Sequence, residues 1–256
     1  MIHGLRVVVV MPAYNAEKTI EKTWQEVMAQ EVVDLVLVVD DASQDNTTEK
    51  ARELDKVVVH RHRRNKGYGA NQKTCYRLAL EHGADIVIMV HPDYQYTPKL
   101  IPAMAGMVAS GLYSCVLASR ILGGQALAGG MPWWRYLANR GLTLVSNIIL
   151  GTKLSEFHTG YRAYSRELLE QLPLNHNSDD FVFDSQIIAE TVWLRAPIGE
   201  VSCPTSYAPD ASSIDFWSSV RYGFGCLGTA AAFRLARWNL VRSPRFPALP
   251  HEARAR

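Results

Sequence analysis

Residues 5–11 read LRVVVVM, a nearly continuous aliphatic run that passes directly into the polar stretch PAYN at 12–15. A strand covered by helices on both faces has this composition, because its side chains are buried on either side. Further strand-like runs occupy 34–41, 56–61 and 84–91, and helix-like segments separate the runs at 17–30, 45–55 and 69–83. This alternation in short units predicts an α/β fold with a parallel, doubly wound sheet.

Polar groups follow each of these four predicted strands. In doubly wound sheets, ligands bind in the crevice outside the carboxyl ends of the strands. The four polar stretches are PAYN at 12–15, DDASQDNT at 40–47, HRRNKGYGAN at 62–71 and HPDYQ at 91–95. We therefore expect four loops that are far apart in the sequence to meet in one site.

Composition and charge exclude several classes of protein. A chain of 256 residues with 48% hydrophobic residues can bury a large core, and a net charge of +2 is too small to indicate nucleic acid as the main partner. The four cysteines are far apart, which argues against a structural zinc site or a disulfide framework and favours the cytoplasm. The N-terminus lacks the pattern of a signal peptide. The uncharged stretch 100–119 contains one proline and two glycines, and is expected to form a helix, a turn and a strand rather than a membrane span.

The second half of the chain is less regular. A Gly-rich stretch at 120–134 is expected to be a functional or mobile loop that precedes a helix at 134–151. From residue 216 onward the chain has seven arginines, interleaved with aromatic residues, and one acid. A helix of this kind either lies peripherally in a lipid interface or packs on the domain with a solvated basic face. The expected organisation is a main domain at 1–215, an amphipathic helical segment at 216–242 and a disordered tail at 243–256.

Two adjacent carboxylates, Asp40 and Asp41, end the second predicted strand. One of them can accept hydrogen bonds from a nucleobase or ribose while the other orients its loop. Ser43 or Asp45 can in addition cap the next helix. Both aspartates are therefore candidates for a nucleotide-binding loop.

The stretch VIMVHPDYQY at 87–96 ends a buried strand on alternating metal-capable side chains. Asp93 and Gln95 offer the oxygen donors that suit Mg²⁺ or Mn²⁺, and His91 is a borderline ligand. A cation held there would neutralise a leaving nucleoside diphosphate. The alternative is a loop that simply caps the strand.

An ordered set of motifs across residues 5–215 resembles glycosyltransferase family 2, and within it the polyprenyl-phosphate (dolichyl-phosphate) mannosyl- or glucosyltransferases. The motifs are VVMPAYNAEKTI, VVDDASQDNT, NKGYGAN, HPDYQ, ASRILGG, HTGYRAYSR and FVFDSQI. No single motif is decisive, but seven of them in the right order make chance an unconvincing explanation. The resemblance implies a GT-A fold, a nucleotide-sugar donor and a lipid-phosphate acceptor.

The resemblance also implies roles for residues on the donor side. Pro12, Tyr14, Asp41 and the Lys66–Gly67 turn match the nucleotide-binding positions of the family. Asp93 and Gln95 match the last two members of its acidic metal motif, D-x-D-x-Q. This chain departs from the motif at the first member, because His91 stands where the family has aspartate. A neutral imidazole contributes less negative charge, so the metal site is expected to be weaker or shifted toward Mn²⁺, or His91 does not bind the ion.

On the acceptor side, Arg120 and Arg162 match family positions near the acceptor phosphate and the donor diphosphate, where guanidinium groups suit phosphate oxygens. Arg140 is a further candidate, and Asp184 matches an acid near the acceptor. For each of these residues the alternative is a structural salt bridge. The later stretch PTSYAPDASSI at 204–214 has Ser206 where the family usually has an arginine, which places the usual acceptor or full activity in question.

These residues predict an inverting transferase that moves a sugar from a GDP- or UDP-sugar to a lipid phosphate. Such an acceptor is already anionic near neutral pH, because the second pKa of a phosphate monoester is about 6, and it needs no strong base. Transfer to a hydroxyl would need one, and Asp184 or Glu156 would have to serve. A non-catalytic nucleotide-sugar binder is the third possibility. A nucleotidyltransferase is disfavoured, because no Gly-rich basic loop follows the first strand.

Overall fold

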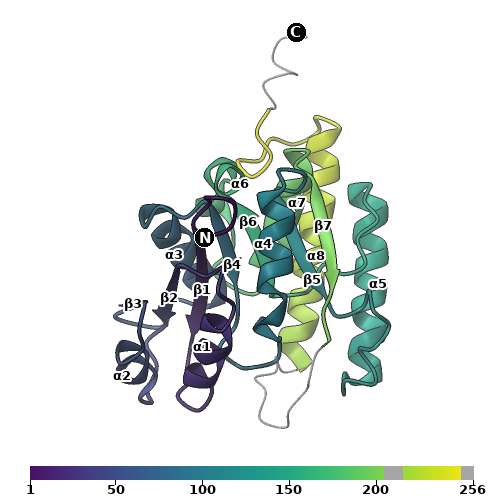
Figure 1. The fold of residues 1–256 in the computed structure, drawn as a ribbon. Helices are drawn as coiled ribbons and strands as arrows, with labels where there is room; N and C mark the ends of the chain where they lie inside the picture. The colour runs from purple at the N-terminus through teal and green to yellow at the C-terminus, as the bar shows by residue number, and fades with distance from the viewer. Residues whose placement is uncertain (205–215, 249–256) are drawn as a thin grey trace.

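A computed structural model describes residues 1–204 and 216–248, and its core is one seven-stranded mixed sheet of order β3-β2-β1-β4-β6-β5-β7 (Figure 1). Strand β6 runs antiparallel to both of its neighbours, and the other pairs in the sheet are parallel. The strands are β1 (Val7–Ala13), β2 (Leu35–Asp40), β3 (Val57–Arg61), β4 (Ile86–Met89), β5 (Cys115–Ser119), β6 (Arg162–Ser165) and β7 (Ile198–Ser202).

Helices cover both faces of this sheet, which confirms the predicted α/β class. Alternate residues of β1 enter two separate cores: Val7 and Val9 pack with helices α1 and α4, whereas Val8 and Val10 pack with α3 and α7. The helices are α1 (Ile20–Met28), α2 (Thr47–Arg52), α3 (Tyr68–Glu81), α4 (Ile101–Ala109), α5 (Trp133–Leu150), α6 (Arg166–Gln171), α7 (Phe183–Trp193) and α8 (Phe216–Arg237), with short 3₁₀ turns at Pro98–Leu100 and Leu174–His176.

The first four strands and three helices fall where the sequence predicts them, and the uncharged stretch 100–119 forms α4, a turn and β5 as expected. Helix ends differ by a few residues, since α1 begins at Ile20 and α2 is confined to Thr47–Arg52. Strand β6 was not predicted. It has four residues and includes a buried arginine, so it shows no apolar run. Within the described residues no helix has both the length and the hydropathy needed to cross a bilayer.

The C-terminal part of the chain packs on the domain rather than standing apart. Helix α8 contributes Ala230, Phe233 and Ala236 to the core and ends at Arg237, not at 242. Asn239 follows in the left-handed region with a φ of 59°. Part of the tail predicted to be disordered from residue 243 is ordered, because Phe246 is buried against Trp193 with a ring separation of 5.3 Å. Residues 249–256 lie outside the described part.

Candidate active site

The polar loops that follow β1 and β2 are joined by direct hydrogen bonds. The backbone N–H of Asp41 donates to the carbonyl of Ala13 over 2.9 Å. The N–H of Asn15 donates to the Ser43 hydroxyl over 2.8 Å, and the Asn15 side-chain oxygen accepts from the N–H of Gln44. Tyr14, between Ala13 and Asn15 in the chain, has an exposed ring, whereas Pro12 is buried within β1 beside Val39.

The two adjacent aspartates hold different structures. Asp40 is fully buried and accepts hydrogen bonds from the backbone N–H and hydroxyl of Ser43 and from the hydroxyl of Thr48. Its carboxylate also lies 3.4 Å from Nε of Arg61. Asp40 is therefore the carboxylate that orients its own loop, and this geometry does not support direct contact of Asp40 with a nucleotide.

Asp41 instead joins its loop to the turn that follows β3. Its two carboxylate oxygens accept from the backbone N–H groups of Lys66 and Gly67, each over 2.9 Å, and Oδ1 also lies 2.7 Å from Nδ1 of His62. Gly67 has a φ of 98°, and a Cβ there would lie 2.6 Å from the carbonyl oxygen of Asp179. The sequence thus predicted two groups that the structure brings together. Oδ2 accepts one of these bonds and keeps a second lone pair, although the Asp41 side chain is only 4% exposed.

His91 takes part in a hydrogen-bond chain with Tyr68 and Asp184. The Tyr68 hydroxyl donates to Oδ2 of Asp184 over 2.8 Å and lies 3.2 Å from Nε2 of His91. Since a hydroxyl has one proton, Nε2 of His91 must be the donor in the second bond. The imidazole also stacks on the Tyr68 ring and fills the space beside Gly160, where a Cβ would lie 2.6 Å from Nε2. Its Nε2 is committed, so the geometry does not support His91 as a metal ligand through that atom.

The turn that carries Asp93 and Gln95 is held by contacts between Tyr94 and two residues outside the turn, Glu26 and Lys22. Tyr94 has a φ of 60°, which is uncommon for a bulky residue and persists only where neighbours fix it. Its hydroxyl donates to Glu26, and the ammonium of Lys22 lies 3.8 Å from its ring centre. Within the turn, Oδ1 of Asp93 accepts from the N–H of Gln95 over 3.1 Å.

This turn fits a metal ion that takes few ligands from the protein. In the described part of the chain, no three His, Cys, Asp or Glu side chains gather as a metal set. Mg²⁺ commonly binds through one or two carboxylates together with substrate phosphates and water. Asp93 and Gln95 supply oxygen donors of this kind on a partly exposed turn.

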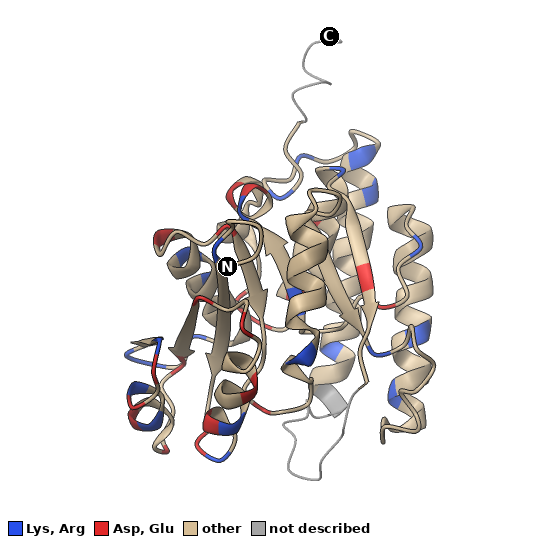
Figure 2. Ribbon diagram, viewed as in Figure 1, with Lys and Arg blue, Asp and Glu red and all other residues tan. Residues whose placement is uncertain are grey.

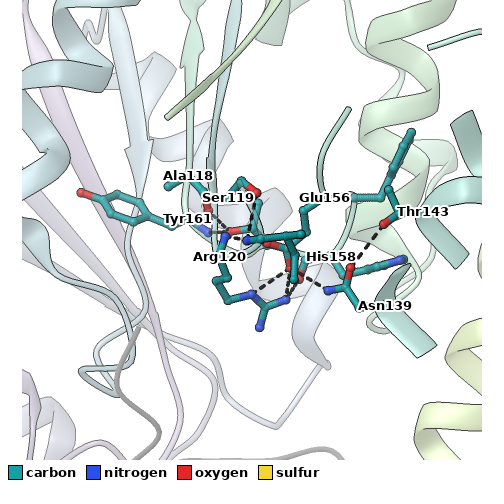
Figure 3. Close-up of polar contacts among 12 residues, drawn as sticks. Ala118, Ser119, Arg120, Asn139, Thr143, Glu156, His158 and Tyr161 are labelled. Atoms are coloured by element: carbon teal, nitrogen blue, oxygen red, sulfur yellow. Dashed lines mark hydrogen bonds and ion pairs between the residues drawn. The ribbon is translucent and has the colours of Figure 1, made fainter. Parts of the chain in front are cut away.

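Arg120 is anchored by a buried carboxylate, as Figure 3 shows. Its Nε donates to Oε1 of Glu156 over 2.8 Å, Nη2 bonds the same oxygen, and the backbone N–H donates to Oε2 over 2.8 Å. Asn139 on α5 donates to Oε1 as well, over 2.8 Å. Burial by itself raises the pKa of Glu156, but the charge and hydrogen bonds of Arg120 outweigh it and hold the pKa below its usual value. Glu156 is therefore ionised and fixes the direction of the arginine.

Arg162 does not face the loops in this structure. It is fully buried, and its guanidinium donates to the carbonyls of Thr159, Phe157 and Asp184 over 2.7, 3.2 and 2.9 Å. The carboxylate of Asp184 lies 3.5 Å from Nη1. The predicted contact with a phosphate is therefore not supported, and Arg162 instead ties the 157–159 segment to the first turn of α7.

Several polar residues around the site were missed by sequence reasoning. Gln72 donates to Oδ1 of Asp184 over 3.1 Å, and Nδ1 of His158 lies 2.7 Å from the hydroxyl of Tyr222 on α8. Burial lowers the pKa of His158 to about 4, so its imidazole is neutral at neutral pH. The Tyr68–Asp184 and His158–Tyr222 contacts gave no signal because the residues in each pair are more than sixty positions apart in the chain. Among the predicted residues, the exposed Arg140 donates to the Ser155 carbonyl over 3.2 Å, and Ser206 lies outside the described residues.

Comparison with known proteins identifies the group to which this site belongs. The profile of Glycosyl transferase family 2 matches residues 8–173. The UDP-N-acetylglucosamine–dolichyl-phosphate N-acetylglucosaminyltransferase of Methanococcus voltae is 27% identical over 214 residues, which cover 77% of this chain and 84% of the relative. The undecaprenyl-phosphate mannosyltransferase of Micrococcus luteus is 28% identical over 207 residues, with 77% and 82% covered.

A solved structure gives the same fold. The glucosyl-3-phosphoglycerate synthase of Mycobacterium tuberculosis, in complex with Mn²⁺, UDP and glucosyl-3-phosphoglycerate, has a TM-score of 0.69 and an identity of 21%, with 94% of this chain and 82% of that one covered. At this identity the likeness concerns the fold alone. Because the family profile spans more than half of the chain, the protein belongs to glycosyl transferase family 2, and its fold is GT-A.

Proposed function

We propose that the protein transfers a sugar, with inversion, from a GDP- or UDP-sugar to a polyprenyl-phosphate-type lipid. One observation carries this proposal: the two carboxylates expected to act as a base on a hydroxyl acceptor, Glu156 and Asp184, each accept hydrogen bonds from two side chains. Glu156 is bonded to Arg120 and Asn139, and Asp184 accepts from Tyr68 and Gln72. A hydroxyl acceptor requires a base, whereas a phosphate acceptor brings its own negative charge. The names of the relatives from Methanococcus voltae and Micrococcus luteus favour the same acceptor class.

In this proposal the donor lies over the loops after β1, β2 and β3. The Tyr14 ring is the exposed aromatic surface for a base, and Asp41 with the Lys66–Gly67 turn receives the nucleoside. Asp93 and Gln95 would hold a Mg²⁺ or Mn²⁺ ion, whose chemistry is to neutralise the departing diphosphate. Structures of the Mycobacterium tuberculosis synthase with either ion and UDP support a divalent cation in proteins of this fold.

Arg120 would bind the acceptor phosphate. Its side chain keeps 13% of its surface exposed, while its carboxylate partner is fully buried. A guanidinium held in this way meets an incoming phosphate without reorganising, which is the condition for effective electrostatic stabilisation. Arg162 and Asp184 would act indirectly, by fixing α7 and Tyr68.

The test is transfer of radiolabelled sugar from GDP-mannose, UDP-glucose or UDP-N-acetylglucosamine to polyprenyl phosphate in detergent with Mn²⁺, with the matching polyprenol as the hydroxyl control. We expect product with the phosphate alone, and a drop in kcat/KM of at least tenfold for Arg120→Gln. Asp184→Asn, which keeps the size of the side chain, should retain measurable turnover. Transfer to the polyprenol that Asp184→Asn abolishes would instead establish a hydroxyl acceptor with Asp184 as the base.

A non-catalytic nucleotide-sugar binder is the second candidate, and the position of His91 favours it. The imidazole that replaces the aspartate of the metal motif is bonded to Tyr68 through Nε2 and removes one negative charge from the site. Calorimetric titration of UDP and GDP with and without Mn²⁺ separates the two candidates. Nucleotide affinity that is indifferent to Mn²⁺, together with no turnover on any donor, would favour the binder.

A further inference from the structure

Three of the four buried residues of helix α5 are polar, and many of its large apolar side chains are exposed. Asn139, Thr143 and Ser146 are buried, whereas large apolar side chains on the opposite side stand in water. The exposed ones include Trp133, Leu137, Leu144 and Ile148, whose exposed fractions are 72, 64, 61 and 67%. Their spacing of four, seven and four residues places them in one stripe along the helix. A surface helix of a globular protein ordinarily has the reverse arrangement.

The inner face of α5 is explained by the active site. Asn139 donates to Glu156, which orients Arg120, and the Thr143 hydroxyl donates to the side-chain oxygen of Asn139 over 3.3 Å. The outer stripe has no such explanation in the fold. Helix α5 stands at the edge of the molecule, and its one extensive contact among the described elements is with α8 (Figure 1).

The two chain segments that form α5 and α8 carry charged side chains of a single sign. The chain has no acidic residue between Asp93 and Glu156, and none between Asp215 and Glu252. Figure 2 accordingly shows basic bands and no acidic ones on α5 and α8. Arg140, Arg221 and Arg237 are exposed there. An apolar stripe with tryptophan at one end and cationic surroundings matches an interface between water and anionic lipid.

We propose that the outer stripe of α5, formed by Trp133, Leu137, Leu144 and Ile148, docks on an anionic membrane surface. The proposal rests on the lipid-acceptor function given above. A second copy that docked through the same stripe would bring arginines against arginines, with no acidic residue from 94 to 155 to offset them. Anionic headgroups supply the complementary charge, at about fivefold in affinity for each basic residue near the surface.

Docking through α5 would also position the active site relative to the bilayer surface. The two faces of one helix, about 10 Å across, would meet the bilayer on one side and hold Asn139 and Glu156 on the other. Arg120 would then lie about one helix diameter from the lipid headgroups. The phosphate of a membrane lipid lies in this headgroup region. For the C-terminal helix, the sequence left a lipid interface and packing on the domain as alternatives, and α8 packs Ala230, Phe233 and Ala236 into the core.

The test is flotation with vesicles of phosphatidylcholine, alone or mixed with phosphatidylglycerol. We expect binding to the mixed vesicles, weakened by salt, and a loss of about two orders of magnitude or more in partitioning for the triple variant Leu137→Gln, Leu144→Gln, Ile148→Gln. Because these side chains are exposed, the variant should fold. The matched control for Leu144→Gln is Leu112→Gln, since Leu112 is 69% exposed between α4 and β5, and this control should bind like wild type.

Sugar transfer in detergent separates this proposal from the proposed function. The triple variant should keep wild-type turnover on detergent-solubilised polyprenyl phosphate and lose it on acceptor embedded in vesicles. Vesicle binding without any sugar transfer would refute the proposed function but support the docking face. A wild-type protein that does not float, or a triple variant that floats equally well, would overturn the docking face. So would a wild-type dimer that the triple variant dissociates, because the stripe would then be covered by a second copy.

Discussion

Replacing Glu156 with glutamine tests the arrangement on which the site depends. The carboxylate is fully buried and receives bonds from the Arg120 guanidinium, the Arg120 backbone and Asn139. Removing one partner of a buried ion pair costs about 3–5 kcal/mol, because the other charge is left uncompensated. Arg120 keeps some exposure and glutamine keeps an acceptor, so we expect the lower end, about 3 kcal/mol.

The assay is thermal and urea unfolding of wild type, Glu156→Gln, Arg120→Gln and the double variant. For a chain of this size each kcal/mol lowers the Tm by about 2–4 °C, so a fall of roughly 6–12 °C is expected for Glu156→Gln. The double-mutant cycle should give a coupling of about 1–3 kcal/mol, since the two side chains share a bond at 2.8 Å.

The pH dependence of this difference has a defined sign. The pKa of Glu156 in the folded protein lies below its ordinary value of 4.5, so the unfolded chain binds the proton first as the pH falls. The advantage of wild type over Glu156→Gln should be complete above pH 4.5 and shrink below it. A coupling near zero, or a stability difference that stays constant down to pH 3, would refute the ion-pair argument.

Three further outcomes follow from the same contacts. Tyr68→Phe deletes the donor to Asp184 and should lower the free energy of unfolding by about 1–3 kcal/mol in urea titration, whereas an unchanged midpoint would show that the bond contributes nothing. Gly67→Ala forces a Cβ against the Asp179 carbonyl at a φ of 98° and should cost about 1–3 kcal/mol in thermal unfolding and weaken nucleotide binding in calorimetry; a wild-type Tm and affinity would contradict it. Because burial lowers the pKa of His158 to about 4, the unfolded chain binds its proton first, and wild type should lose up to about 3 kcal/mol relative to His158→Gln between pH 6.5 and pH 4, a trend that a flat pH profile would exclude.

The sequence was most informative where a pattern is local. The aliphatic runs of β1, β2 and β4 are buried on both faces, and each ends in the polar loop that the parallel sheet brings to one edge. Asp41 and the Lys66–Gly67 turn were predicted separately and are joined by two hydrogen bonds of 2.9 Å. Strand β6 escaped prediction, because its four residues pair with strands that lie far away in the sequence.

Side-chain direction could not be predicted, because it depends on partners that are distant in the chain. Arg120 and Arg162 are both arginines in family motifs, yet one reaches the edge of the site and the other is saturated by three backbone carbonyls. Asp40 and Asp41 are neighbours, and one turns into its own loop while the other bridges to the next. A motif therefore fixes which chemical groups are present, while packing decides which of them face a ligand.

The anchoring of Arg120 has an electrostatic consequence for the acceptor. The Arg120–Glu156 pair is neutral as a unit, so the pair by itself gives an anionic headgroup directed hydrogen bonds but little net attraction. The net positive potential has to come from basic residues whose charge no carboxylate offsets. Arg140 is one, because among residues 1–204 and 216–248 its guanidinium bonds a backbone carbonyl and no carboxylate, and it belongs to the same acid-free stretch that carries the outer stripe of α5. In this arrangement the exposed face of α5 attracts the lipid phosphate, and its buried face helps to orient Arg120, which binds that phosphate. One helix would therefore contribute both to the approach of the acceptor and to its alignment for transfer.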